Sequence, residues 1–180
     1  TDLVAKAAPD GYTLLHVTAS FVINPLTYTK LPYDINRNFE PVVNVVLGTG
    51  YLLLASNTVP ANSVKEFIGF ARDGKLSYSS PGVGNTLHLA AELFAVRTGV
   101  KLLHVPYKGV APAVVDLIGG QIELVIAGIS IAMPQVKSGK LKALGITSRT
   151  RSPVLPEVRP IAEDAPTLKL LAVAASKQHA

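Results

Sequence analysis

The sequence has no cysteine and no tryptophan, and it contains a single methionine. The absence of cysteine excludes a disulfide framework and thiolate chemistry. Charged residues make up only 16% of the 180 residues and aromatic residues only 6%. The net charge is +5, but the lysines and arginines are scattered and form no basic stripe. These features argue against a nucleic-acid-binding protein and leave attraction of small anions as the functional reading of the charge.

The sequence also lacks an apolar run of the roughly 20 residues that a membrane-spanning helix needs. The longest candidate, Val42 to Ala55, is interrupted by Asn44 and by the glycines of 48–50, so we expect a pair of buried strands there. No charged region followed by an apolar region occurs at Thr1, which predicts a cytosolic protein or one whose leader has been removed. Hydrophobic residues make up 48% of the chain, enough for a core of one or two small domains.

Strand and helix patterns alternate along most of the chain. Such alternation is typical of an α/β fold with a mostly parallel sheet covered on both faces. An isolated strand is predicted earlier, over 13–18, and residues 168–173 are read as a strand or a helix. In the regular part, strands are predicted over 76–80, 101–105, 122–127 and 141–147, and helices over 63–72, 86–98, 109–118 and 130–137.

The most informative segment runs from Tyr78 to His88 and reads as a strand, a turn with two glycines, and the start of a helix. Such a turn directs backbone N–H groups and the positive end of the helix dipole to one point, which suits a carboxylate or a phosphate. Ser79, Ser80 and Asn85 add neutral donors, which favour a carboxylate that must be released again. Neither glycine-rich nucleotide-binding pattern occurs, so no cofactor is predicted.

Ligands of such sheets bind at the carboxyl ends of the strands, where the turns after Ser80, Val105 and Ala127 are expected. At the second turn, Tyr107 or Lys108 would contact the far end of a ligand, or Asp116 would neutralise the lysine. At the third turn, Ser130 either caps its helix or faces the cleft. The predicted ligand-binding residues are Ser80, Gly82, Val83, Gly84, Asn85, Thr86, His88, Tyr107, Lys108, Ala127, Gly128, Ser130, Ala19 and Ser20.

Patterns for catalysis and metal binding are weak. His88 and Glu92 have the spacing of one helix face, but no third metal ligand is apparent. Ser80 and His88 could be combined into a nucleophile and a base, yet nothing in the sequence places them within hydrogen-bond reach. A Gly-x-Ser-x-Gly elbow and a His-Glu-x-x-His pattern are absent. We therefore predict a binding protein without metal, cofactor or enzymatic activity.

A series of short segments, each weak alone, occurs in a fixed order along nearly the whole chain. They are AAPDGYTL (7–14), INP (23–25), LPYD (31–34), VPA (59–61), GVGNTLHLA (82–90), HVPYKG (104–109), SGKL (138–141), RSP (151–153) and LPEV (155–158). In order and spacing these segments resemble the Bug/TctC family, the extracytoplasmic solute-binding receptors of tripartite tricarboxylate transporters.

The resemblance implies a two-lobed periplasmic binding protein of the type II, Venus-flytrap architecture. Such receptors capture carboxylates, including dicarboxylates and aromatic acids, and deliver them to membrane transporter subunits. In the family, the segment matching Gly82 to Thr86 holds a carboxylate through backbone amides and waters, with His88 supporting the turn. The turn after Ala127 would line the cleft beside it.

Members of the family are longer than this chain, which predicts a fragment without the family's first strand and loop and without its C-terminal portion. The expected organisation is a partial first lobe (1–49), a second lobe (50–162), and a tail or partial return to the first lobe (163–180). Apolar strands left without lobe partners would favour a homodimer. One alternative is the effector-sensing domain of a LysR-type regulator, and another is an enzyme using Ser80, His88 or Lys108.

Overall fold

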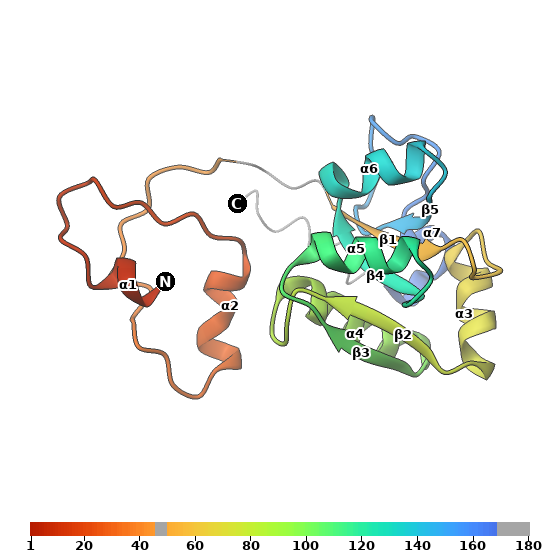
Figure 1. Ribbon diagram of the computed structural model, residues 1–180, viewed down its shortest axis with the longest axis horizontal. Coiled ribbons are helices and arrows are strands. Elements are labelled where there is room, and N and C mark those ends of the chain that lie inside the picture. The colour runs from red at the N-terminus through yellow and green to blue at the C-terminus, as the bar shows by residue number, and fades with distance from the viewer. Residues whose placement is uncertain (46–49, 169–180) are drawn as a thin grey trace. The chain divides into compact units, whose positions relative to one another are not determined.

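The computed structural model describes residues 1–45 and 50–168 (Figure 1). The chain divides into two compact units, one within residues 1–46 and the other within residues 47–180. The helix or strand predicted at 168–173 lies almost entirely outside the described residues, and so does most of the predicted tail.

The first unit, residues 1–45, contains two short helices, α1 (Asp2–Ala5) and α2 (Ser20–Thr27), and no strand among its described residues. The strand predicted over 13–18 is therefore wrong. Leu14 is 73% exposed and Val17 42% exposed in this irregular segment. A strand needs a neighbour for its backbone hydrogen bonds, and the described part of this unit supplies none.

Three aromatic rings form the packing centre of the first unit. Phe21 and Phe39 meet edge-to-face with ring centroids 5.2 Å apart, and Tyr33 lies 5.8 Å from Phe39 and 6.1 Å from Phe21. Asn24 Nδ2 donates a hydrogen bond to the Tyr33 hydroxyl at 3.2 Å. No residue of 1–45 is fully buried, so this unit has little apolar core beyond the three rings.

The second unit, residues 50–168, is an α/β layer structure, as predicted. Its helices and strands follow the expected alternation closely (Figure 1). In chain order they are β1 (Tyr51–Ser56), α3 (Val64–Asp73), β2 (Leu76–Ser80), α4 (Thr86–Thr98), β3 (Leu102–Pro106), α5 (Val110–Ile118), β4 (Leu124–Gly128), α6 (Ile129–Lys137), β5 (Leu141–Ile146), α7 (Ile161–Asp164) and a 3₁₀ turn (Pro166–Leu168).

The five strands form one sheet in the order β3-β2-β4-β1-β5. β2 is parallel to β3 and β4, whereas β1 is antiparallel to both β4 and β5. Four strands thus share one direction and β1 alone runs against them. Two of the four pairings are therefore antiparallel, so the sheet is mixed and less parallel than predicted. The strand pair predicted within Val42 to Ala55 is wrong, because the described part contains only β1, while Val42 and Val43 are about three-quarters exposed.

Both faces of the sheet are covered. On one face, α3, α4 and α7 pack over a cluster that includes Leu53, Tyr78 and Phe94. On the other face, α5 and α6 pack over a second cluster that includes Leu52 and Val125. The uninterrupted apolar stretch of β1 is explained by this arrangement, since its alternate residues enter opposite clusters. No helix in 1–45 or 50–168 has the length and apolar character needed to cross a membrane.

Local sequence signals fix the helix ends. Ser63 Oγ accepts from the Glu66 N–H at 3.2 Å, so Ser63 caps α3. The Glu66 carboxylate accepts from the N–H of Asn62, the residue before the cap, at 2.8 Å. Asn85 Oδ1 accepts from the Leu87 N–H at 2.9 Å at the start of α4. These caps define where α3 and α4 begin.

Candidate functional site

The turns after β2, β3 and β4 lie at the same edge of the sheet, as the sequence predicts. The Tyr107 N–H donates to the Ser80 carbonyl at 2.9 Å, which joins the first two turns. Because β1 runs the other way, its first residue, Tyr51, also lies here, opposite Gly128. Sequence reasoning missed Tyr51 at this edge, because the direction of β1 depends on its pairing with distant strands.

We call residues 81–85 the glycine turn. Gly82 has φ 131° and Gly84 has φ 79°, a region of backbone conformation that favours glycine. The N–H of Gly84 donates to His88 Nδ1 at 3.4 Å, and that of Gly82 donates to Ser80 Oγ at 3.2 Å. Two of the N–H groups that the sequence assigns to a ligand are therefore already hydrogen-bonded within the chain. Val83, 68% exposed, retains an N–H without an acceptor among the described residues.

Ser80 lies beneath the turn and is only 1% exposed. Its Oγ lies 2.8 Å from His104 Nε2, so the serine pairs with a histidine of β3 and not with His88. The same Oγ lies 3.2 Å from the Gly82 carbonyl. Sequence reasoning missed His104 as a site residue. His104 lies opposite Tyr78 only because β2 and β3 pair in parallel in this register. The register between two strands cannot be predicted from the sequence of one strand alone.

His88 lies in the first turns of α4, with its side chain 15% exposed. Its Nε2 is 4.0 Å from Glu92 Oε1, and the Tyr78 hydroxyl donates to that same oxygen. The His88 and His104 ring centroids are 4.4 Å apart, and His104 stacks on Tyr78 at 4.9 Å. Two imidazoles, a phenol and a carboxylate thus form one connected cluster below the glycine turn.

Burial, and after it the neighbouring His88, lowers the pKa of His104, while Glu92 opposes this shift. Burial also raises the pKa of the Tyr78 hydroxyl, and its hydrogen bond to Glu92 adds to the increase. At neutral pH the cluster therefore holds a neutral His104 and a neutral Tyr78. A neutral histidine has one donor nitrogen and one acceptor nitrogen, so it can donate one hydrogen bond and accept another within the cluster.

The turn after β3 brings Tyr107 and Lys108 to the edge. The Tyr107 hydroxyl donates to Asp116 Oδ2 at 2.6 Å, and this hydrogen bond is the main cause of a raised Tyr107 pKa. Asp116 therefore neutralises no lysine here. Lys108 is exposed and forms no ion pair with a described residue, so its ammonium is available at this edge.

The helices that follow β3 and β4 begin at glycines. Gly109 precedes α5 and Gly128 precedes α6, and neither N-cap has a side-chain hydrogen bond. The interpretation of Ser130 as a cap is wrong, because it lies exposed inside the first turn of α6. Ala127 is fully buried in the core, so it can present only backbone atoms. The first-turn N–H groups of these helices have no side-chain cap to compete with a ligand.

Three predicted residues remain to be placed: Ala19, Ser20 and Thr86. Ala19 and Ser20 stand at the start of α2, in the first unit, and their role stays a prediction. Thr86 is the first residue of α4. Within the described ranges, no group of three or more His, Asp or Glu side chains could hold a metal ion.

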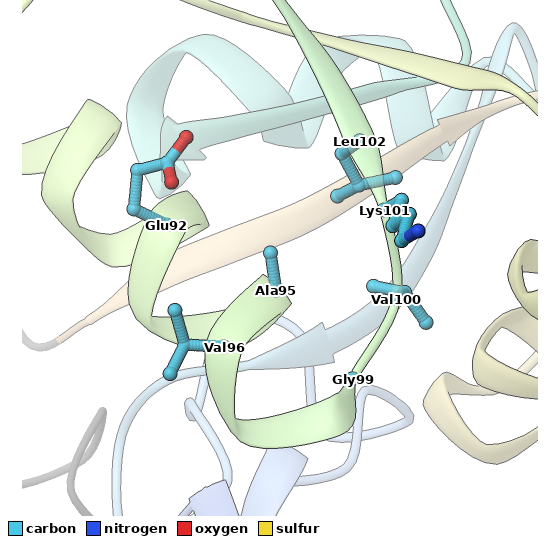
Figure 2. A pocket seen from close by; sticks show the side chains of 7 residues that line it. All are labelled: Glu92, Ala95, Val96, Gly99, Val100, Lys101 and Leu102. Atoms are coloured by element: carbon cyan, nitrogen blue, oxygen red, sulfur yellow. The ribbon is translucent and has the colours of Figure 1, made fainter.

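A hollow of about 390 Å³ lies apart from the turns, between α4 and the start of β3 (Figure 2). Figure 2 shows Glu92 at one side of it and Lys101 near the entry of β3. The other lining residues are apolar or glycine: Ala95, Val96, Gly99, Val100 and Leu102. The hollow extends toward the carboxyl end of α4, away from the glycine turn, so it is not the predicted site.

Comparison with known proteins gives a consistent result. Residues 1–174 match the model of a family described as the tripartite tricarboxylate transporter family receptor, TctC. A protein of Pseudomonas sp. strain P51 encoded in the tcbD-tcbE intergenic region is 40% identical over 171 residues, which is 92% of this chain and 49% of that protein. BugT of Bordetella pertussis is 35% identical over 167 residues, 91% of this chain and 51% of BugT.

Solved structures show the same relationship. The R. palustris protein Rpa4515 with adipate is 30% identical, with a TM-score of 0.85 over 97% of this chain and 66% of that structure. The periplasmic binding protein BugD is 29% identical, with a TM-score of 0.81 over 97% of this chain and 65% of BugD. The chain spans about half the length of the curated relatives it matches.

Proposed function

The chain belongs to the TctC family of tripartite tricarboxylate transporter receptors, and we propose that it captures a small carboxylate for a transporter of that type. The family consists of periplasmic solute-binding receptors, so the predicted family and the periplasmic-binding-protein fold are confirmed. Its members are receptors and not enzymes, which agrees with the prediction of no enzymatic activity. The LysR-type alternative is not favoured. A periplasmic location and membrane transporter subunits as partners are parts of the proposal.

The convergence of three strand-to-helix turns at one sheet edge carries this proposal. Three features there suit an anion: the unpaired Val83 N–H, the exposed Lys108, and the uncapped starts of α5 and α6. We assign one carboxylate of the ligand to the glycine turn. A second carboxylate would interact with Lys108 or with the first turn of α6. A dicarboxylate fits two separated positive positions better than a monocarboxylate does.

Adipate, the ligand of the R. palustris relative, is the first candidate because that protein is 30% identical to this chain. The proposed assignment of lobes follows the two compact units. Residues 50–162 would supply the second-lobe half of the carboxylate site, and Ala19 and Ser20 would contribute from the first lobe. A homodimer stays part of the proposal; since the described residues of 1–45 contain no strand, β3 and β5 are the sheet edges that could pair.

Thermal unfolding of the 180-residue chain tests the proposal. Aliphatic dicarboxylates of four to six carbons, adipate among them, should raise Tm because a ligand that binds only the folded state stabilises it. At about 100 times Kd the gain is about 2.7 kcal/mol, or roughly 5–10 °C for a chain of this size. Hexane-1,6-diol, which has the length of adipate without its charges, should give no shift. No shift with any dicarboxylate, or an equal shift with the diol, would contradict the proposal.

A further inference from the structure

We propose that His88 and His104, each in its neutral form, act together as positioning residues for the glycine turn. His88 would hold the Gly84 peptide directly, and His104 would hold the Gly82 peptide through Ser80. This inference rests on the proposed function, because it assigns the two histidines a role in shaping the turn that would hold the carboxylate. We call His88, His104 and Ser80 the imidazole brace.

The contacts reach the turn at its two glycines. Gly84 N–H donates to His88 Nδ1 at 3.4 Å, and Gly82 N–H donates to Ser80 Oγ at 3.2 Å. Ser80 in turn is 2.8 Å from His104 Nε2. The peptide between these two held positions is that of Val83, whose N–H has no acceptor among the described residues. Rotation of either glycine peptide would therefore change the direction of the N–H assigned to the ligand.

The protonation state of each imidazole matters for these contacts. His88 Nδ1 can accept from Gly84 N–H only while it carries no proton. With the proton of the neutral ring assigned to Nδ1, His104 Nε2 accepts from the Ser80 hydroxyl, whereas a doubly protonated ring donates to it. The hydroxyl hydrogen must then turn to the Gly82 carbonyl, 3.2 Å away. Protonation of either ring thus alters the hydrogen bonds of one glycine.

The surroundings of His104 favour its neutral form. The ring centroids of His88 and His104 are 4.4 Å apart, so a proton on His88 disfavours a proton on His104. Tyr78 stacks on His104 from β2 and stays neutral, while Glu92 on α4 is the anionic group that opposes this effect. The lowered pKa of His104 agrees with this balance. Mild acid should therefore loosen the glycine turn.

The test is a pH titration of the full chain by NMR, from about pH 5 to about pH 8, across the range in which histidine titrates. The amide resonance of Gly82 should follow the protonation of His104, and that of Gly84 should follow His88. His104→Gln keeps a donor and an acceptor but cannot titrate, so Gly82 should lose its pH dependence. His16→Gln, at an exposed histidine of the first unit, is the matched control and should change neither glycine.

Adipate binding supplies a second readout. Wild-type Kd should rise as the pH falls from about 7.5 to about 5.5. His104→Leu should bind about fivefold to tenfold more weakly at the higher pH, the effect of one lost hydrogen bond to a partly buried group. His104→Gln should match wild type at about pH 7.5 and show a smaller loss in acid.

The two proposals fail in different ways. If the glycine amides do not follow the imidazoles, or if Kd is independent of pH and His104→Leu binds normally, the brace is refuted while the proposed function stands. If the amides follow the imidazoles but no carboxylate binds at either pH, the brace is supported and the proposed function is refuted. His104→Gln keeps this comparison available should His104→Leu fail to fold.

Discussion

Replacement of Gly84 by valine should affect both the stability of the fold and the binding of a ligand at the glycine turn. Gly84 is buried and has φ 79°. A β-branched residue is strongly disfavoured there, because its Cβ crowds the neighbouring backbone. The strained peptide would also displace the N–H that donates to His88 Nδ1. We therefore expect two losses, one of stability and one of ligand binding.

The size of the first loss follows from the cost of a non-glycine residue in a sparsely populated backbone region, about 1–3 kcal/mol. For a chain of this length each kcal/mol lowers Tm by roughly 2–4 °C, so Gly84→Val should unfold about 2–12 °C below wild type. The second loss should be complete. The rise in Tm caused by adipate should disappear.

Gly139→Val is the matched control. Gly139 has φ 71°, nearly that of Gly84, and a Cβ added there meets no atom within 4 Å. It follows the carboxyl end of α6, at the edge of the sheet opposite the glycine turn. This variant should lose a similar amount of stability, by the same backbone strain, and keep the full adipate shift.

Differential scanning fluorimetry of both variants, with and without adipate, decides the matter. An adipate shift that survives in Gly84→Val would refute the placement of the carboxylate at the glycine turn. A shift lost equally in both variants would also refute it, because lost stability alone would then explain the result.

Two further predictions concern stability. A Cβ at Gly145 would lie 2.9 Å from Ile161 Cγ1, so Gly145→Ala should lower the free energy of unfolding, measured in urea, by about 1–3 kcal/mol. Gly69 lies on the open face of α3, so Gly69→Ala should raise it by about 0.5–1 kcal/mol. Equal effects of the two substitutions would contradict the described packing of α7 on β5. Because the pKa of Tyr78 is raised beside Glu92, the folded chain keeps a proton that the unfolded chain releases near pH 10.0. The free energy of unfolding, measured in urea, should therefore fall as the pH rises above that value. Tyr78→Phe should show a shallower fall.

The sequence predicts the helices of the second unit well because their signals are local. The Ser63 and Asn85 caps each depend on residues within one turn, and Gly99 ends α4 in the left-handed conformation. The glycine turn is predictable for the same reason, because positive φ at two closely spaced positions requires glycine.

The direction of β1 and the role of His104 were not predictable, because both depend on pairing between distant strands. The residues of β1 are buried on both faces, so the alternation that fixes a register is missing from them. His104 acquires its contact with Ser80 only when β3 is aligned beside β2. The strand predicted at 13–18 is wrong for the opposite reason. Its residues are typical of a strand, but no described segment pairs with them.

The central claim is that a small dicarboxylate binds at the sheet edge formed by the three turns. Titration of isotope-labelled chain with adipate, followed by amide resonances, tests it most directly. We predict saturable shifts concentrated at 82–86, at Tyr107 and Lys108, and at 128–130, with little change around the hollow near Val96 and Lys101. Shifts confined to that hollow, or no saturable shift at the turns, would contradict the account.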